Sequence, residues 1–75
     1  MITYEPFWET LNDSVETTYT LIKDHSISSS TLDRLRKNKA VSTNTVDDLC
    51  RILDCPVESV IKYMSSDEEK ADSDR

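Results

Sequence analysis

Residues 18–37, TYTLIKDHSISSSTLDRLRK, decide the fold expected of this 75-residue chain. Their apolar residues fall at helical spacing on both sides of a polar turn: Tyr19, Leu21, Ile22, Ile27, Leu32 and Leu35. They predict a short helix ending near His25, a tight turn over residues 25–28, and a second helix that is capped by the serines and runs to Lys39. The second helix buries a narrow stripe and exposes polar and basic side chains. This arrangement fits a helix-turn-helix unit, and from periodicity and charge alone it fits equally well a solvated helix whose charges serve only solubility.

Three further helices are predicted around this unit. Their apolar stripes are Phe7, Trp8, Leu11 and Val15; Val46, Leu49, Cys50, Ile52 and Leu53; and Val57, Val60, Ile61 and Met64. The first helix covers about residues 5–13, the fourth is capped by Ser42 or Asn44, and the fifth begins at Pro56. Because no period-two alternation is sustained anywhere, the predicted class is all-α, a compact five-helix bundle.

The net charge of -6 is unevenly distributed. Residues 67–75 hold five acids, two bases and one apolar residue, which predicts an acidic, disordered tail after a single domain of residues 1–66. Residues 23–39 carry five bases against two acids, so one face of the acidic protein is predicted to be basic. Since the chain shows neither an apolar stretch that could cross a bilayer nor a secretory leader, we expect a cytoplasmic protein with no membrane partner.

Catalytic and metal sites are not expected. A domain of this length encloses too little space for a large catalytic pocket, and no Ser-His-Asp or paired-carboxylate arrangement is present. The absence of glycine excludes phosphate-cradling loops. Cys50, Cys55 and His25 lack a fourth ligand at zinc spacing, and both cysteines are interpreted as small core residues in a reducing compartment. We therefore expect no enzyme, no cofactor, no metal and no small-molecule substrate.

The stretch at 18–37 resembles the helix-turn-helix of the lambda repressor/Cro-type family, and the likeness extends from YEPFW (residues 4–8) through LCRILDC (residues 49–55) to VIKY (residues 60–63). It covers about residues 2–64 and is nearest to small stand-alone bacterial or phage regulators. Two positions depart from the family pattern, which usually has Gly where this chain has Ser26 and Ala where it has Ile22. We expect Ser26 to be slightly strained, and Ile22 to separate the two helices or to rotate outward.

The resemblance implies a transcriptional regulator of the repressor type that binds specific double-stranded DNA through its third helix. The family's base-contacting positions fall on Ser29, Ser30, Asp33 and Arg34, whose side chains can bond to base edges in the major groove. Phosphate contacts are expected from Thr18, Lys37, Asn38, Lys39, Ser42 and Thr43. Because one small domain makes few contacts, a homodimer is expected, with a surface on the fifth helix near Tyr63 and Met64.

The alternative is a protein-interaction module on the same fold, similar to an antirepressor or an antitoxin-like partner, that does not read DNA. Its support is the net charge of -6, because phosphate repels an acidic protein at long range. The two hypotheses differ in the placement of the basic cluster. DNA binding is favoured if its members form one surface with the outer face of the third helix, and the interaction module gains support if they scatter: Arg34, Arg36, Lys37 and Lys39.

Overall fold

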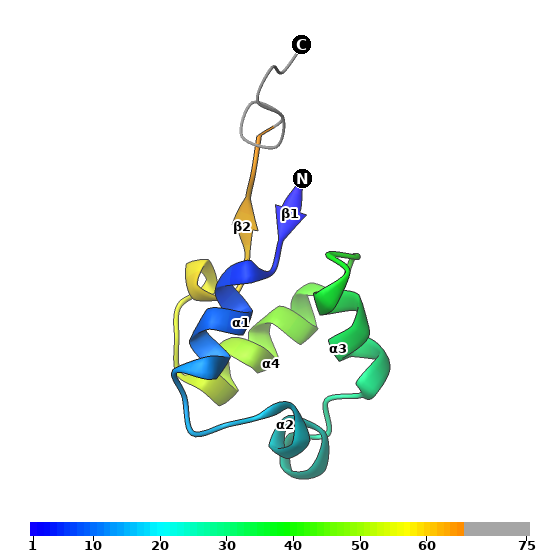
Figure 1. Cartoon of the computed structure of the whole chain (residues 1–75), viewed down its shortest axis with the longest axis vertical. Coiled ribbons are helices and arrows are strands. Elements are labelled where there is room, and N and C mark those ends of the chain that lie inside the picture. The colour runs from blue at the N-terminus through cyan, green and yellow to red at the C-terminus, as the bar shows by residue number, and fades with distance from the viewer. Residues whose placement is uncertain (66–75) are drawn as a thin grey trace.

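The computed structural model describes residues 1–65, and in that part short helices surround a common core (Figure 1). In chain order the elements are β1 (Ile2–Thr3), α1 (Glu5–Asn12), α2 (Thr18–His25), α3 (Ser29–Arg36), α4 (Thr43–Leu53), the 3-10 turn η1 (Val57–Ser59) and β2 (Lys62–Tyr63). The first four predicted helices are confirmed, and the third ends earlier than expected. The predicted tail at 67–75 lies outside the described residues. None of the described helices has the length and apolar character needed to cross a membrane.

The predicted fifth helix is wrong, although residues 1–65 form a mostly helical compact domain with four helices and a 3-10 turn. Only the turn η1 forms, after which Val60 is fully buried and the chain extends into β2. β2 pairs antiparallel with β1, so that Ile2 lies opposite Tyr63. The Met64 amide also donates a hydrogen bond to the Met1 carbonyl at 2.8 Å. Pairing with the N-terminal segment thus satisfies the backbone groups that a fifth helix would have bonded internally.

Hydroxyl side chains begin three of the helices. The N-caps of α2, α3 and α4 are Thr17, Ser28 and Ser42, and each side-chain oxygen accepts a hydrogen bond from the amide three residues further on. Each bond satisfies one of the first amides of a helix, which have no intrahelical partner. The serines and threonines before each apolar stripe therefore explain where these helices start.

The same three helices end at residues with positive φ, although the chain has no glycine. These residues are Ser26 after α2 (φ 61°), Asn38 after α3 (φ 56°) and Asp54 after α4 (φ 52°). At each end the next amide donates to a carbonyl of the last turn, at 2.9 to 3.0 Å: Ile27 to Leu21, Lys39 to Arg34, and Cys55 to Cys50. This bond satisfies a terminal carbonyl and stops the helix.

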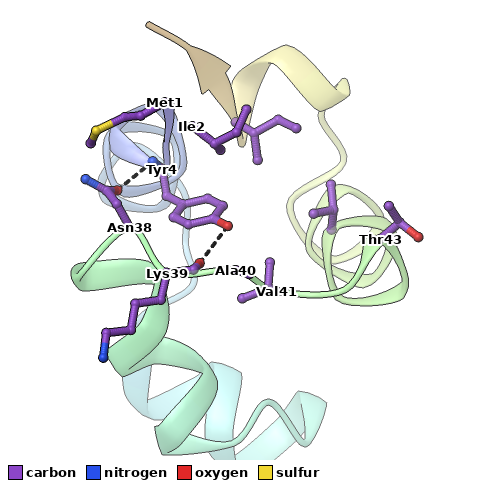
Figure 2. A pocket seen from close by; sticks show the side chains of 10 residues that line it. Met1, Ile2, Tyr4, Asn38, Lys39, Ala40, Val41 and Thr43 are labelled. Atoms are coloured by element: carbon purple, nitrogen blue, oxygen red, sulfur yellow. Dashed lines mark hydrogen bonds between the residues drawn. The ribbon is translucent and has the colours of Figure 1, made fainter. Parts of the chain in front are cut away.

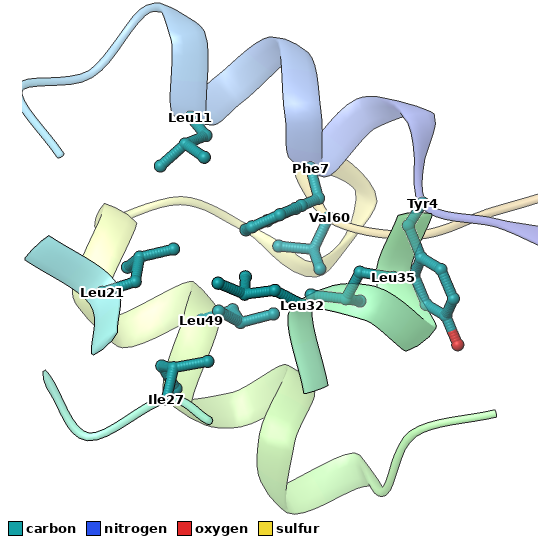
Figure 3. Packing of buried hydrophobic residues seen from close by; sticks show 9 residues of the cluster. All are labelled: Tyr4, Phe7, Leu11, Leu21, Ile27, Leu32, Leu35, Leu49 and Val60. Atoms are coloured by element: carbon teal, nitrogen blue, oxygen red, sulfur yellow. The ribbon is translucent and has the colours of Figure 1, made fainter. Parts of the chain in front are cut away.

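An apolar cluster joins all four helices (Figure 3). Its fully buried members are Phe7 from α1, Leu21 from α2, Leu32 and Leu35 from α3, Leu49 from α4, and Val60. Figure 3 shows these side chains converging from the surrounding elements into one layer. Because α3 contributes only its two leucines to this cluster, the rest of its surface remains available for other contacts.

Candidate nucleic-acid interface

The turn between α2 and α3 fixes how the two helices meet. Ser26 lies in the left-handed region, with φ 61° and ψ 27°, and the Ile27 amide bonds the Leu21 carbonyl at 3.0 Å. The side chains of Ile27 and Leu21 are both buried beneath the turn, as is usual for this kind of helix end. The strained conformation expected at Ser26 is confirmed. Ile22 is 44% exposed, so of the two outcomes expected for it the outward rotation is the one observed.

The outer surface of α3 carries the predicted base-contacting residues. Leu32 and Leu35 hold the opposite surface in the core. At about 100° per residue, the side away from this pair carries Ser30, Asp33, Arg34 and Lys37, with Ser29 at its edge. All five residues are exposed. We call this set the α3 face.

Charges on the α3 face are partly paired. The Lys37 Nζ lies 3.1 Å from the Asp33 Oδ2, one helical turn away, and both side chains are about half exposed. The Ser30 Oγ lies 3.1 Å from the Ser28 Oγ of the helix cap. Arg34 forms no ion pair or side-chain hydrogen bond with any residue among 1–65. Within that range its guanidinium therefore keeps all five N–H donors available.

Arg36 lies outside the α3 face. Its guanidinium carbon is 5.5 Å from the centre of the Trp8 ring of α1, and the Trp8 Nε1 donates to the Leu35 carbonyl at 3.4 Å. This cation-π contact holds Arg36 on the flank of α3 that meets α1. The predicted basic cluster is therefore divided, because Arg34 and Lys37 lie on the α3 face and Arg36 does not.

The loop after α3 is fastened to the N-terminal segment. The Asn38 Oδ1 accepts hydrogen bonds from the Tyr4 amide at 3.0 Å and from the Thr3 hydroxyl at 3.4 Å. The Tyr4 hydroxyl donates to the Lys39 carbonyl at 2.8 Å (Figure 2). The Lys39 side chain is exposed and points away from this contact in Figure 2. Asn38 thus has a structural role that sequence reasoning missed, whereas the Lys39 ammonium remains accessible.

The other predicted phosphate contacts lie where α2 and α4 begin. Ser42 caps α4, and Thr43 is its exposed first residue. Thr18 is the half-buried first residue of α2, and the cap of that helix is its neighbour Thr17. Amides at a helix N-terminus favour a bound anion, so both helix starts have the chemistry that a DNA phosphate requires.

A carboxylate beside α2 is a further feature that sequence reasoning missed. The Thr20 hydroxyl donates to the Glu16 Oε1 at 2.7 Å, and the Glu16 Oε2 lies 3.3 Å from the His25 Nε2. The Thr20 hydrogen bond lowers the pKa of Glu16; partial burial opposes this shift, and His25 adds to it. The ionised carboxylate is thus favoured close to the first turn of α2 and opposes a phosphate near Thr18.

A family model described as the Cro/C1-type HTH DNA-binding domain matches residues 7–66 of the chain. The chain belongs to this family. Searches of curated proteins and of solved structures found no match. Membership implies DNA binding by this Cro/C1-type domain, and proteins of such helix-turn-helix families are typically not enzymes.

The Cro/C1-type domain also has an open groove of about 400 Å³ between β1, the loop after α3, and α4 (Figure 2). Apolar side chains dominate its lining: Met1, Ile2, Val41, Val46 and Ile61. No group of three or more His, Cys, Asp or Glu side chains that could hold a metal occurs among residues 1–65. Phosphates and base edges are polar, so the α3 face is a better site for DNA than this groove.

Proposed function

We propose that this Cro/C1-type domain is a sequence-specific transcriptional regulator of the repressor type, with α3 in the major groove of duplex DNA. The observation that carries the proposal is the α3 face, where the Arg34 guanidinium, unpaired among residues 1–65, accompanies short polar side chains. Arg34 can bond guanine O6 and N7 together, Asp33 can accept from cytosine N4, and the serines Ser29 and Ser30 can donate or accept. These four residues are the base contacts of the proposal.

Phosphate contacts at the rim complete the proposed complex. Lys37 and Lys39 supply ammonium groups, and Asn38 retains its amide NH2 because only its oxygen forms side-chain hydrogen bonds among residues 1–65. Ser42 and Thr43 are exposed at the start of α4, where the amides of a first helical turn favour an anion. Thr18 is the weakest of the proposed contacts because of the carboxylate beside the same helix end. Such contacts position the domain but do not choose its sequence.

A homodimer is part of the proposal, although the helix expected to carry its interface does not form. We place the interface on the face of the two-stranded sheet where Ile2 and Tyr63 lie directly opposite each other, 42% and 65% exposed. Opposite residues of an antiparallel pair share one face, so these two side chains form one apolar patch. Sedimentation at tens of micromolar should show a dimer that Tyr63→Asp weakens. A monomer both with and without DNA would remove the dimer from the proposal.

Selection from a random duplex library with the purified protein, followed by titration of the selected site, tests DNA reading. Arg34→Ala should weaken binding to the selected site by about 1–3 kcal/mol, roughly 5- to 150-fold, and relax preference at one base pair. Lys39→Ala should weaken all sequences alike and lower the salt slope by about one. Arg51→Ala is the matched control, because Arg51 is an exposed arginine on α4 that pairs with Asp48. Unchanged binding of Arg34→Ala to the selected site would refute the assignment of α3.

A protein-interaction module remains the second candidate because of the placement of charge. Arg36 is held against α1, Glu16 lies beside α2, and the whole chain carries -6. Each of these features weakens attraction to phosphate. If the parent protein selects no sequence from the library, this second function becomes the better one.

A further inference from the structure

The C-terminal end of α4 brings two cysteines together. Asp54 ends the helix in the left-handed region, with φ 52° and ψ 54°, and the Cys55 amide donates to the Cys50 carbonyl at 3.0 Å. In this kind of helix end, the side chains at these two positions usually contact each other. Both thiols are free, half-buried and packed against the core. The proposed DNA contacts use neither of them.

The backbone limits how far apart the two residues can lie, and this limit is close to the longest Cα separation that a disulfide spans. With standard bond lengths, a hydrogen bond of 3.0 Å from the Cys55 nitrogen to the Cys50 oxygen limits their Cα separation to about 6.9 Å. Disulfides span Cα separations of roughly 4.4 to 6.8 Å, and the turn at Asp54 directs the chain back toward the helix. The pKa of the Cys55 thiol is raised, first by burial and then by the charge and hydrogen bonding of the Cys50 thiol.

We propose that Cys50 and Cys55 form a dithiol site that closes to an intramolecular disulfide when a low-molecular-weight disulfide such as oxidised glutathione is present. This modification is distinct from DNA binding and does not depend on the function proposed above. Closure links the last turn of α4 covalently to the segment that leads into η1 and Val60. In Figure 1 this end of α4 lies across the domain from α3, so the α3 face stays open in both redox forms.

The exchange proceeds in two balanced steps. The Cys50 thiolate attacks one sulfur of the small disulfide, forming a mixed disulfide and releasing one thiolate. Cys55 then loses its proton to solvent, and its sulfur attacks the Cys50 sulfur and releases the second thiolate. Overall two protein thiols are oxidised and one small disulfide is reduced to two thiols. Burial raises the pKa of the Cys55 thiol, and Cys50 and then Asp54 add to this shift, so Cys55 is assigned the second step.

The test equilibrates the reduced full-length chain with glutathione buffers of increasing oxidised fraction, followed by acid quenching and intact mass measurement. The expected product has lost two hydrogens and remains a single chain on a non-reducing gel. The titration gives the closure constant, which is the equilibrium constant for forming the intramolecular disulfide from the dithiol and oxidised glutathione. The same titration in denaturant gives this constant for the unfolded chain. Because the hydrogen bond from the Cys55 amide to the Cys50 carbonyl holds the two residues close together in the folded chain, the constant of the folded chain should be at least about tenfold larger.

Two matched variants identify the product. Cys50→Ser and Cys55→Ser each keep one thiol, so each should carry one glutathione at most and should never lose two hydrogens. The proposal is overturned if the folded parent chain accumulates mixed disulfides or linked dimers, or does not react. A closure constant no larger in the folded than in the unfolded chain also overturns it, because α4 would then contribute nothing to the pairing.

Discussion

Replacing Ser26 with glycine should leave the free energy of unfolding unchanged or raise it by up to about 1 kcal/mol. The left-handed conformation, with φ 61°, costs a residue with a Cβ roughly 1–2 kcal/mol, and glycine avoids this. Glycine also increases the conformational entropy of the unfolded chain, and this lowers the free energy of unfolding by about 0.5–1 kcal/mol. The Ser26 side chain is exposed and has no hydrogen bond to any residue among 1–65, so its removal costs nothing further.

Asn38→Gly is the matched control, because Asn38 has nearly the same backbone conformation, with φ 56°. Here the substitution also removes the oxygen that accepts from the Tyr4 amide, and an unpaired buried amide costs about 1–3 kcal/mol. Urea titration and thermal melting followed by circular dichroism measure both variants, and 1 kcal/mol corresponds to about 4–8 °C in a domain of this size. A loss of about 1 kcal/mol or more in Ser26→Gly, or equal effects in the two variants, would refute this reasoning.

The remaining predictions concern charge and packing. The pKa of Glu16 is lowered in the fold. The stability that its ionised carboxylate contributes is therefore present above the unfolded pKa of about 4.3 and is lost as the pH falls through the folded pKa. In an acid titration, the free energy of unfolding of Glu16→Gln should decrease less steeply with falling pH than that of the parent protein. A chain ending at residue 66 loses five acids and two bases, so it should melt at an unchanged temperature and bind non-specific DNA more tightly at low salt. Leu49→Ala, at a fully buried position, should lower the free energy of unfolding by about 2–5 kcal/mol in a urea titration.

Local chemistry was sufficient to predict where most helices begin. The hydroxyls of Ser28 and Ser42 stand directly before an apolar stripe, and each caps its helix as such residues do. The spacing of residues 57–64 misled because it fits one face of a helix and equally a turn followed by a short strand. What decides between them is a partner strand at the other end of the chain. Two-residue strands are too short to show alternation, so no local pattern reports this pairing.

In the candidate site, too, features set by neighbouring residues could be predicted from the sequence, whereas features set by distant residues could not. The α3 face could be predicted because Leu32 and Leu35 determine which side of the helix is buried. The position of Arg36 could not, since it depends on a ring of α1 that lies far away in the sequence. Asn38 did carry a usable signal, because asparagine is one of the few residues that readily adopts the left-handed conformation in a chain without glycine.

The pairing of β1 with β2 has a consequence for folding kinetics. Met1 and Met64, which are hydrogen-bonded to each other, are 63 positions apart, whereas most helical contacts are local. Closing such a long loop carries a large entropic penalty that local contacts avoid, so the strand pair forms after the helices have collapsed. With only two residues in each strand, it is also the first part of the native domain to open. The Met64 amide should therefore exchange its hydrogen through local opening, while the amides of Leu32 and Leu49 exchange only when the whole domain unfolds.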